Sequence, residues 1–346
     1  MLPNASPILA PASPQAAVSP HHPLVVFVTD HGFLVPSLVA ARQLVSQGVH
    51  KLADIVVYAV GLEPAYLARL AGEPALRHIR FESLAHELFA PPGDVQFFKN
   101  HVPATSLARL ALPEVIPASC DSIVYLDGDV QVVGDISALV RTRVPDGWIM
   151  AGRGSAWLDI GRTSRIKTPP DYLAGLGGVA EERYFNAGVL AFSRSTWENA
   201  APRALQFFFD NSQACIRHDQ SALNAVFKDR VIELAPRYNF HSAYADLHVQ
   251  DRYDPAIIHF TGPRKPWGHA TGPWKGRFQS TYRRLVDDVP SLAPYLTIHD
   301  AGPVRSFVRD VKASVAERRR VRADWDEIAA RRQAFFRYVE STPFPC

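Results

Sequence analysis

Short, strongly apolar runs alternate with amphipathic segments along the first 130 residues of the chain. Apolar runs of strand length are typical of buried parallel strands, and they fall at residues 24–28, 55–60 and 123–126, while His-Ile-Arg-Phe at 78–81 is a candidate for a further strand. Between them, apolar residues at helical spacing predict helices over 36–47, 65–70 and 105–112. The alternation favours an α/β protein in which helices cover both faces of a parallel sheet.

The second half of the chain is less regular. Apolar runs predict further strands over 188–192, 231–234 and 257–260. Helices are expected over 196–210 and 219–227, and the side chain of Asp219 is placed to cap the second of these.

From residue 303 to residue 340, apolar residues such as Phe307 and Phe335 recur on one helical face, and the opposite face is rich in arginine. A basic amphipathic helix of this kind can lie on an anionic membrane surface. It can equally pack on the protein body with its charged face in water. Interspersed acidic residues such as Asp310 and Glu317 favour the second interpretation, and both stay open at this point.

The composition, with 47% hydrophobic and 21% charged residues, is that of an ordinary soluble globular protein. A net charge of +3 is too small to indicate nucleic acid as a partner. Residues 1–23 are rich in Pro, Ala and Ser and contain no Lys or Arg, which predicts a disordered leader rather than a secretory signal. Three cysteines without metal-site spacing favour a reducing compartment.

Two carboxylates, Asp127 and Asp129, follow the apolar run at 123–126. Side chains two residues apart in an extended strand point to the same face, so these groups aim at one place. Converging carboxylates repel each other and need a cation, a shared proton or a ligand. Their oxygens suit Mg²⁺ or Mn²⁺, and a solvated pair at a turn is the alternative. Asp30 also follows a strand, so it is expected at the same edge of the sheet.

Three further segments accompany the acidic pair in a fixed order. The four are Val-Tyr-Leu-Asp-Gly-Asp at 124–129, Tyr-Phe-Asn-Ala-Gly-Val at 184–189, His-Asp-Gln-Ser-Ala-Leu-Asn at 218–224, and Ile-Ile-His-Phe-Thr-Gly at 257–262, which runs into Lys-Pro-Trp at 265–267. In this order they resemble the family 8 glycosyltransferases, the retaining group that includes glycogenin and bacterial lipopolysaccharide galactosyl- and glucosyltransferases. The resemblance covers roughly residues 24 to 270.

The resemblance implies a GT-A fold, which is a single nucleotide-binding, Rossmann-like α/β domain with a mixed sheet. Here it would occupy residues 24–285, and a C-terminal basic helical extension would occupy 286–346. The family also implies a UDP-sugar donor of glucose or galactose, a saccharide or glycolipid acceptor as in lipopolysaccharide biosynthesis, and bound Mn²⁺ or Mg²⁺. Together with the basic helix, it suggests a cytoplasmic protein with peripheral contact at the inner membrane face.

In the family, the two aspartates and the histidine of the H-x-x-G segment hold the metal against the donor diphosphate. The matching positions are Asp127, Asp129 and His259. A metal there would neutralise charge on the leaving diphosphate. Gly262 and Lys265 match donor-binding positions that follow, and Lys265 would pair with the diphosphate as a point charge.

The family also assigns residues to the nucleotide and the sugar. The loop after the first strand holds uracil and ribose, which assigns Asp30 and the backbone of Val28 to the nucleotide. The family often has asparagine two residues after that aspartate, but this chain has Gly32, which supplies no side-chain amide. Arg109 matches an arginine that reaches the donor site, and Asn186 matches a position that binds sugar hydroxyls.

Asp219 and Gln220 match catalytic positions at the donor sugar, where Asp219 would fix a hydroxyl and Gln220 would lie near the β face of the reacting carbon. A neutral amide is a poor nucleophile, so the two-carboxylate route of retaining glycosidases fits badly. The expected route is front-side attack, in which the acceptor hydroxyl approaches on the face from which the diphosphate leaves.

Two other functions compete with this interpretation. A HAD-type phosphatase would use the first aspartate of the pair as nucleophile, but its second acidic pair would have to be Asp287 and Asp288, which lack a preceding apolar strand. It also leaves the other three segments unexplained. A nucleotide-sugar binding protein without turnover is the second alternative, and the intact Asp127, His259 and Gln220 argue against it.

Overall fold

The computed structural model describes residues 22–93, 104–155, 171–249, 252–262, 265–268, 277–296 and 325–342, together with positions 95, 157, 274, 308, 311, 312, 315, 316 and 319. Most of the disordered leader predicted over 1–23 therefore lies outside the described residues; His22 and Pro23 are described, and Pro23 begins the first strand. Most of the segment 297–324 also lies outside them.

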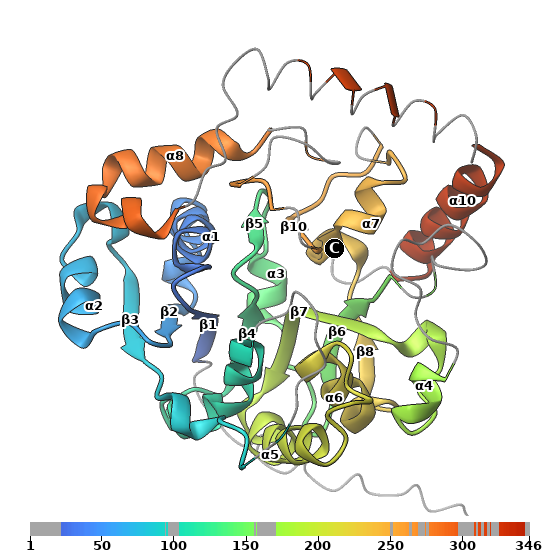
Figure 1. Cartoon of the computed structure of the whole chain (residues 1–346), viewed down its shortest axis with the longest axis horizontal. Coiled ribbons are helices and arrows are strands. Elements are labelled where there is room, and N and C mark those ends of the chain that lie inside the picture. The colour runs from blue at the N-terminus through green and yellow to red at the C-terminus, as the bar shows by residue number, and fades with distance from the viewer. Residues whose placement is uncertain are drawn as a thin grey trace, which may run out of the picture.

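The core of the molecule is a seven-stranded mixed sheet in the order β3-β2-β1-β4-β7-β6-β8 (Figure 1). Its strands are β1 (Pro23–Thr29), β2 (Asp54–Ala59), β3 (Ile79–Ser83), β4 (Ser122–Leu126), β6 (Ile149–Arg153), β7 (Phe185–Ser193) and β8 (Val231–Glu233). The first four run parallel, while β7 is antiparallel to β4 and β6. Every strand predicted from an apolar run is confirmed to within a few residues at either end.

Helices cover both faces of this sheet. They are α1 (Leu34–Ser46), α2 (Pro64–Ala71), α3 (Ser137–Arg141), α4 (Tyr172–Gly175), α5 (Arg194–Asp210), α6 (His218–Phe227), α7 (Ser242–Ala245), α8 (Gln279–Asp288) and α10 (Trp325–Ser341). On β1, Val25 and Phe27 join the buried cluster that includes α1, whereas Leu24 and Val26 join the cluster that includes α5. Because successive side chains of a strand point to opposite faces, both faces of β1 are buried, as the continuous apolar run predicts.

The helix predicted over 105–112 is instead a 3₁₀ helix, η4 (Ala104–Glu114). Pro113 lies inside it. Proline has no amide hydrogen and its ring crowds the preceding turn, so the end of this segment is unsuited to an α-helix.

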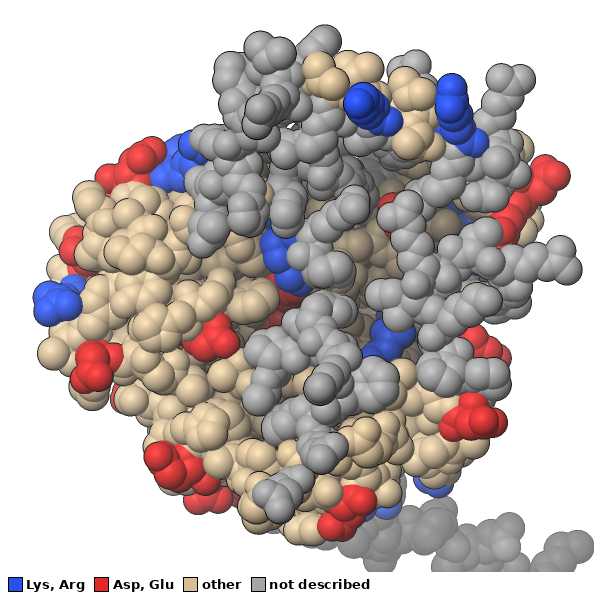
Figure 2. Space-filling model, viewed as in Figure 1, with Lys and Arg blue, Asp and Glu red and all other residues tan. Residues whose placement is uncertain are grey.

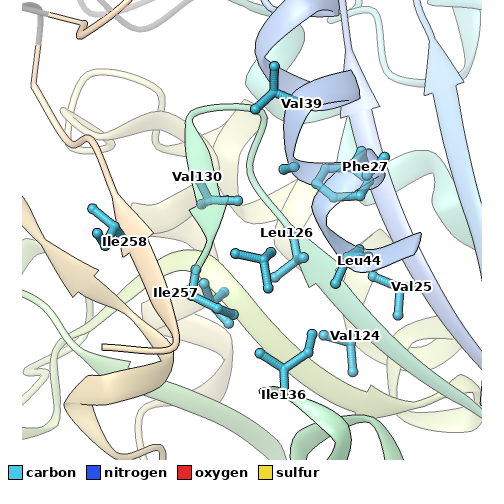
Figure 3. Packing of buried hydrophobic residues seen from close by; sticks show 14 of the residues in the cluster. Val25, Phe27, Val39, Leu44, Val124, Leu126, Val130, Ile136, Ile257 and Ile258 are labelled. Carbon is cyan, nitrogen blue, oxygen red and sulfur yellow. The ribbon is translucent and has the colours of Figure 1, made fainter. Parts of the chain in front are cut away.

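A second sheet of three short strands lies beside the first, in the order β5-β10-β9. Its strands are β5 (Val130–Val132), β9 (Phe240–His241) and β10 (Ile257–His259). The chain passes from β4 through the acidic pair directly into β5, and β5 pairs antiparallel with β10 so that Val130 faces His259. Figure 3 shows Leu126 and Val130, on either side of the acidic pair, packed near Ile257 in one buried cluster. The two ends of the acidic turn are therefore anchored in the core.

The described part of the C-terminal extension packs on the protein body. Phe335 of α10 is fully buried, and its ring centroid lies 4.9 Å from that of Tyr244 and 5.2 Å from that of Tyr253. The hydroxyl of Tyr338 donates a hydrogen bond to the carbonyl of Leu234 at 3.1 Å. The packing interpretation thus holds for 325–341, while contact with a membrane stays a prediction. Among the described residues, no helix combines the length and the apolar composition that crossing a membrane requires.

Replacing Phe335 by alanine should cost about 3–5 kcal/mol of unfolding free energy, because it removes a fully buried ring from the common core. Trp325, which is 55% exposed at the start of the same helix, is the matched control, and its replacement by alanine should change stability by less than about 1 kcal/mol. Urea unfolding followed by fluorescence measures both. Equal midpoints for the two variants would show that α10 is only loosely attached.

Candidate active site

Three metal-ligating side chains converge where β4 turns into β5 and where β10 ends. One ligand atom from each of Asp127, Asp129 and His259 lies within 4.8 Å of the others. The Nε2 atom of His259 is 3.1 Å from Oδ1 of Asp129 and 3.7 Å from Oδ2 of Asp127. Two carboxylates and an imidazole nitrogen form a donor set that Mn²⁺ or Mg²⁺ can use, so the three residues fit a divalent cation. The structure thus brings together all three of the predicted metal ligands.

Gly188 of β7 makes this convergence possible. Its carbonyl accepts the backbone amide of Asp127 at 2.8 Å, which places β7 directly against the acidic turn. A Cβ atom at Gly188 would lie 2.0 Å from Cε1 of His259 and 2.8 Å from Oδ2 of Asp127. Such short distances exclude any residue other than glycine at this position. Gly188 could not be assigned a role from the sequence, because the requirement for glycine arises from the side chains of His259 and Asp127, which lie elsewhere in the chain.

Lys265 belongs to the same cluster. Its ammonium lies 2.5 Å from Oδ2 of Asp129 and donates to the carbonyl of Phe260 at 2.8 Å. Burial alone would raise the pKa of Asp129, but Lys265 and His259 outweigh it and hold that pKa well below the ordinary range. Asp129 is therefore ionised at neutral pH. Figure 2 shows acidic and basic side chains meeting in a recess near the middle of the viewed face.

Arg109 of η4 connects the acidic pair to Asp219. This buried guanidinium donates from Nη2 to Oδ1 of Asp127 at 2.7 Å and from Nη1 to the carbonyl of Ala187 at 2.5 Å. Its Nε atom is 2.9 Å from Oδ2 of Asp219, a close ion pair without the alignment of a hydrogen bond. The guanidinium also lies 4.3 Å from the ring centroid of Tyr125. Arg109 thus forms ion pairs with two carboxylates at once.

The cap predicted for Asp219 is wrong. Asp219 is the second residue of α6, the N-cap position is Arg217, and the side chain at that position makes no capping hydrogen bond. The carboxylate turns inward to Arg109 instead, because a buried charge gains more from a counter-ion than a helix end gains from a cap. Burial raises the pKa of Asp219 above its ordinary range, against the opposing effect of Arg109.

Gln220 and Asn186 lie together beside this cluster. Oε1 of Gln220 accepts the amide hydrogens of Asn186 Nδ2 at 3.1 Å and of the Ala187 backbone at 3.2 Å, and Nε2 of Gln220 donates to the hydroxyl of Tyr184 at 2.8 Å. A further residue, Asn239, joins them through Oδ1 of Asn186 at 2.9 Å. Asn239 lies outside all four sequence segments, so no motif indicated it.

The positions predicted to bind the nucleotide lie at the end of β1. Val28 is part of β1, and Asp30 follows it, next to β4 in the sheet. One carboxylate oxygen of Asp30 accepts the backbone amide of Gly32 at 2.9 Å, and the other accepts the hydroxyl of Thr105 at 2.7 Å. The backbone amide of Gly32 thus helps to fix the orientation of the Asp30 carboxylate. Asp30 therefore lies at the same sheet edge as the acidic pair, as predicted.

Comparisons with known proteins identify a family and relatives to which the chain is similar. The model of glycosyl transferase family 8 matches residues 24–271. General stress protein A of Bacillus subtilis strain 168 is 27% identical over 190 residues, which cover 50% of this chain and 62% of that protein. The lipopolysaccharide 1,2-glucosyltransferase of Escherichia coli strain K12 is 25% identical over 173 residues, which cover 46% of this chain and 48% of that protein. The chain thus spans about half to three fifths of these relatives.

Among solved structures, the galactosyltransferase LgtC in complex with donor and acceptor sugar analogues superposes with a TM-score of 0.61 at 25% identity. The match covers 75% of this chain and 95% of that one. This likeness, together with the mixed sheet, confirms the GT-A fold predicted from the sequence.

Arg109→Met should destabilise the protein by about 3–5 kcal/mol at neutral pH, because it leaves Asp127 and Asp219 without their shared counter-charge. The pKa of Asp219, already raised by burial, should rise further, so the folded variant binds this proton more tightly than the unfolded chain does. The stability of the variant is then highest at acidic pH and is lost as the pH rises past the ordinary range of aspartate.

Urea unfolding at pH 5 and pH 8 measures this effect. Arg203→Met, at an exposed position of α5, is the control and should change little at either pH. If Arg109→Met lowers the free energy of unfolding by the same amount at both pH values, the role assigned to the ion pairs is contradicted.

Proposed function

Because the chain belongs to glycosyl transferase family 8, we propose that it is a metal-dependent retaining glycosyltransferase. It moves a hexose, glucose or galactose, from a UDP-sugar to a hydroxyl of a saccharide or glycolipid acceptor. The observation that supports this most is the convergence of Asp127, Asp129 and His259 at the carboxyl edge of the sheet, where ligands of α/β proteins bind. The E. coli relative named for lipopolysaccharide supports a glycolipid acceptor.

In this proposal, Asp127, Asp129 and His259 hold Mn²⁺ or Mg²⁺. A cation there supplies Lewis-acid neutralisation of the donor diphosphate. Lys265, now paired with Asp129, contributes its charge to the same diphosphate, and Gly262 shapes the turn that carries it. Val28 and Asp30 hold the nucleoside at the end of β1. Arg109 fixes the orientation of Asp127 through its hydrogen bond to Oδ1.

The sugar lies against Asn186, Asp219 and Gln220. The amide oxygen of Gln220 accepts two N–H groups, which draw electron density away from it and make it a still poorer nucleophile. We therefore favour front-side attack. The acceptor oxygen forms its bond to the anomeric carbon on the face where the bond to the diphosphate breaks, and a leaving-group oxygen takes the hydroxyl proton. Configuration is retained without a covalent enzyme intermediate.

The proposed place of action is the cytoplasm, with the basic C-terminal segment in peripheral contact with the inner face of the membrane. The arginine-rich composition of 303–340 supports this. In α10 the apolar residues Phe335 and Tyr338 are used for packing, so the membrane contact would involve the charged face and the segment before α10.

A phosphatase is not favoured by the geometry. The first aspartate of such an enzyme must have a free oxygen for attack on phosphorus. Here Oδ1 of Asp127 accepts hydrogen bonds from both Arg109 and the Tyr125 hydroxyl, and Oδ2 faces His259.

Asp129→Asn should abolish metal-dependent binding of UDP-glucose or UDP-galactose, because it removes a charged ligand and the partner of Lys265. A panel of UDP-sugars is screened for Mn²⁺-dependent hydrolysis, and donor binding is measured by calorimetry with and without Mn²⁺. Asp229→Asn, at an exposed position, is the control. Retention of metal-dependent donor binding in Asp129→Asn would refute the ligand assignment, and release of phosphate from simple monoesters would favour the phosphatase.

Gln220→Ala should reduce turnover severely while UDP affinity stays near normal, since Gln220 contacts the sugar-side residues Asn186 and Ala187 rather than the nucleotide loop. Transfer or hydrolysis rates and UDP titrations separate the two effects. Gln206→Ala, exposed on α5, should match the unaltered protein in both. Unchanged turnover in Gln220→Ala would remove this residue from the mechanism.

A further inference from the structure

Asn239 links the proposed metal ligand to the proposed sugar-binding residue. Its Oδ1 atom lies 2.9 Å from Nδ1 of His259, and its Nδ2 atom donates to Oδ1 of Asn186 at 2.9 Å. Both Asn239 and His259 are buried, so water does not compete for these contacts. Asn239 lies between the short 3₁₀ helix η7 (Pro236–Tyr238) and β9, and a Cβ atom added at Gly152 of β6 would lie 3.3 Å from its Cβ.

The direction of these hydrogen bonds is set by backbone amides, which can only donate. The backbone N–H of Gly188 points to Oδ1 of Asn186 at 3.0 Å, so this atom must be the carbonyl oxygen. The backbone N–H of Ala187 likewise identifies Oε1 of Gln220 as an acceptor, which receives the NH₂ group of Asn186. The orientation of the Asn186 amide is therefore fixed at both ends.

The orientation of Asn239 follows from that of Asn186. Because Oδ1 of Asn186 accepts, Asn239 must present its NH₂ group to it and its carbonyl oxygen to His259. A carbonyl cannot donate, so Nδ1 of His259 must carry a hydrogen. The other ring nitrogen, Nε2, faces Asp127 and Asp129.

We propose that Asn239 is a positioning residue that holds His259 with its hydrogen on Nδ1, so that Nε2 offers its lone pair to a divalent cation. This inference rests on the proposed metal-dependent function. The opposite tautomer would point a hydrogen from Nε2 into the cation site and leave Nδ1 without a donor for the Asn239 carbonyl. The amide that orients the metal ligand also holds Asn186, so the metal and sugar sites share one rigid hydrogen-bonded chain.

Mn²⁺ affinity in the absence of donor, measured by calorimetry and by paramagnetic resonance of free Mn²⁺, tests the proposal directly. Asn239→Leu should weaken Mn²⁺ binding by about 10- to 100-fold, the usual effect of losing such a supporting contact. Asn239→Asp keeps an acceptor for the Nδ1 hydrogen of His259, so its Mn²⁺ affinity should fall much less than that of Asn239→Leu. Asn199→Leu, at an exposed position of α5, should bind Mn²⁺ as the unaltered protein does.

The tautomer itself is read from long-range ¹H–¹⁵N correlation spectra of histidine-labelled protein loaded with diamagnetic Mg²⁺. The unaltered protein should show a protonated Nδ1 and an unprotonated Nε2 for His259, and Asn239→Leu should lose this pattern. A protonated Nε2 in the unaltered protein would overturn the proposal, and this spectrum decides the matter even if Asn239→Leu fails to fold.

Full Mn²⁺ affinity in a folded Asn239→Leu variant would also overturn the proposal. That outcome differs from failure of the proposed function, in which the unaltered protein itself would show no Mn²⁺ binding that depends on Asp129.

Discussion

Three carboxylates lie close together in a largely buried site, where they repel one another, and the surrounding fold must offset that repulsion. Asp127, Asp129 and Asp219 lie around Arg109 and Lys265, and Asp129 and Asp219 are buried. Three carboxyl groups thus face two basic side chains. Such an arrangement is costly unless each carboxylate has a partner. The excess of carboxyl groups over basic side chains makes the site attractive to a cation.

The fold supplies those partners from widely separated parts of the chain. Arg109 comes from η4, Lys265 from the loop after β10, and His259 from the strand that pairs with β5. Gly188 leaves space for His259 and Asp127 to meet against β7. The smaller sheet thus places the imidazole of His259 next to the acidic turn that follows β4 of the larger sheet. The site is built by strand register rather than by a flexible loop.

Much of this could be predicted from the sequence, for identifiable reasons. The parallel strands β1, β2 and β4 are buried on both faces, so each gives a continuous apolar run, and the i, i+2 spacing of Asp127 and Asp129 fixes their common direction. The short strands β5, β6 and β9 were missed, because two to five residues leave no clear periodicity and Gly152 interrupts the apolar run of β6. The ligand role of His259 came from the family resemblance, since a histidine after an apolar strand is by itself ambiguous.

What the sequence could not show depends on distant contacts. Asp219 has the local pattern of a helix cap, but a buried arginine more than a hundred residues earlier in the chain decides its orientation. Asn239 lies between η7 and β9, outside every recognisable motif, and its contacts appear only when Asn186 and His259 are placed on either side of it. Contacts of this kind carry no periodic signal, so they follow from the three-dimensional arrangement alone.

If Asp127, Asp129 and His259 form one divalent-metal site at the donor diphosphate, Mn²⁺ binds between them. The anomalous scattering of Mn²⁺ in crystals grown with Mn²⁺ and UDP shows where the ion lies. We expect a single strong peak within bonding distance of both carboxylates and of Nε2 of His259, with the diphosphate on its open side. A peak elsewhere, or UDP bound at this edge with no Mn²⁺ between it and these three residues, would refute this metal site.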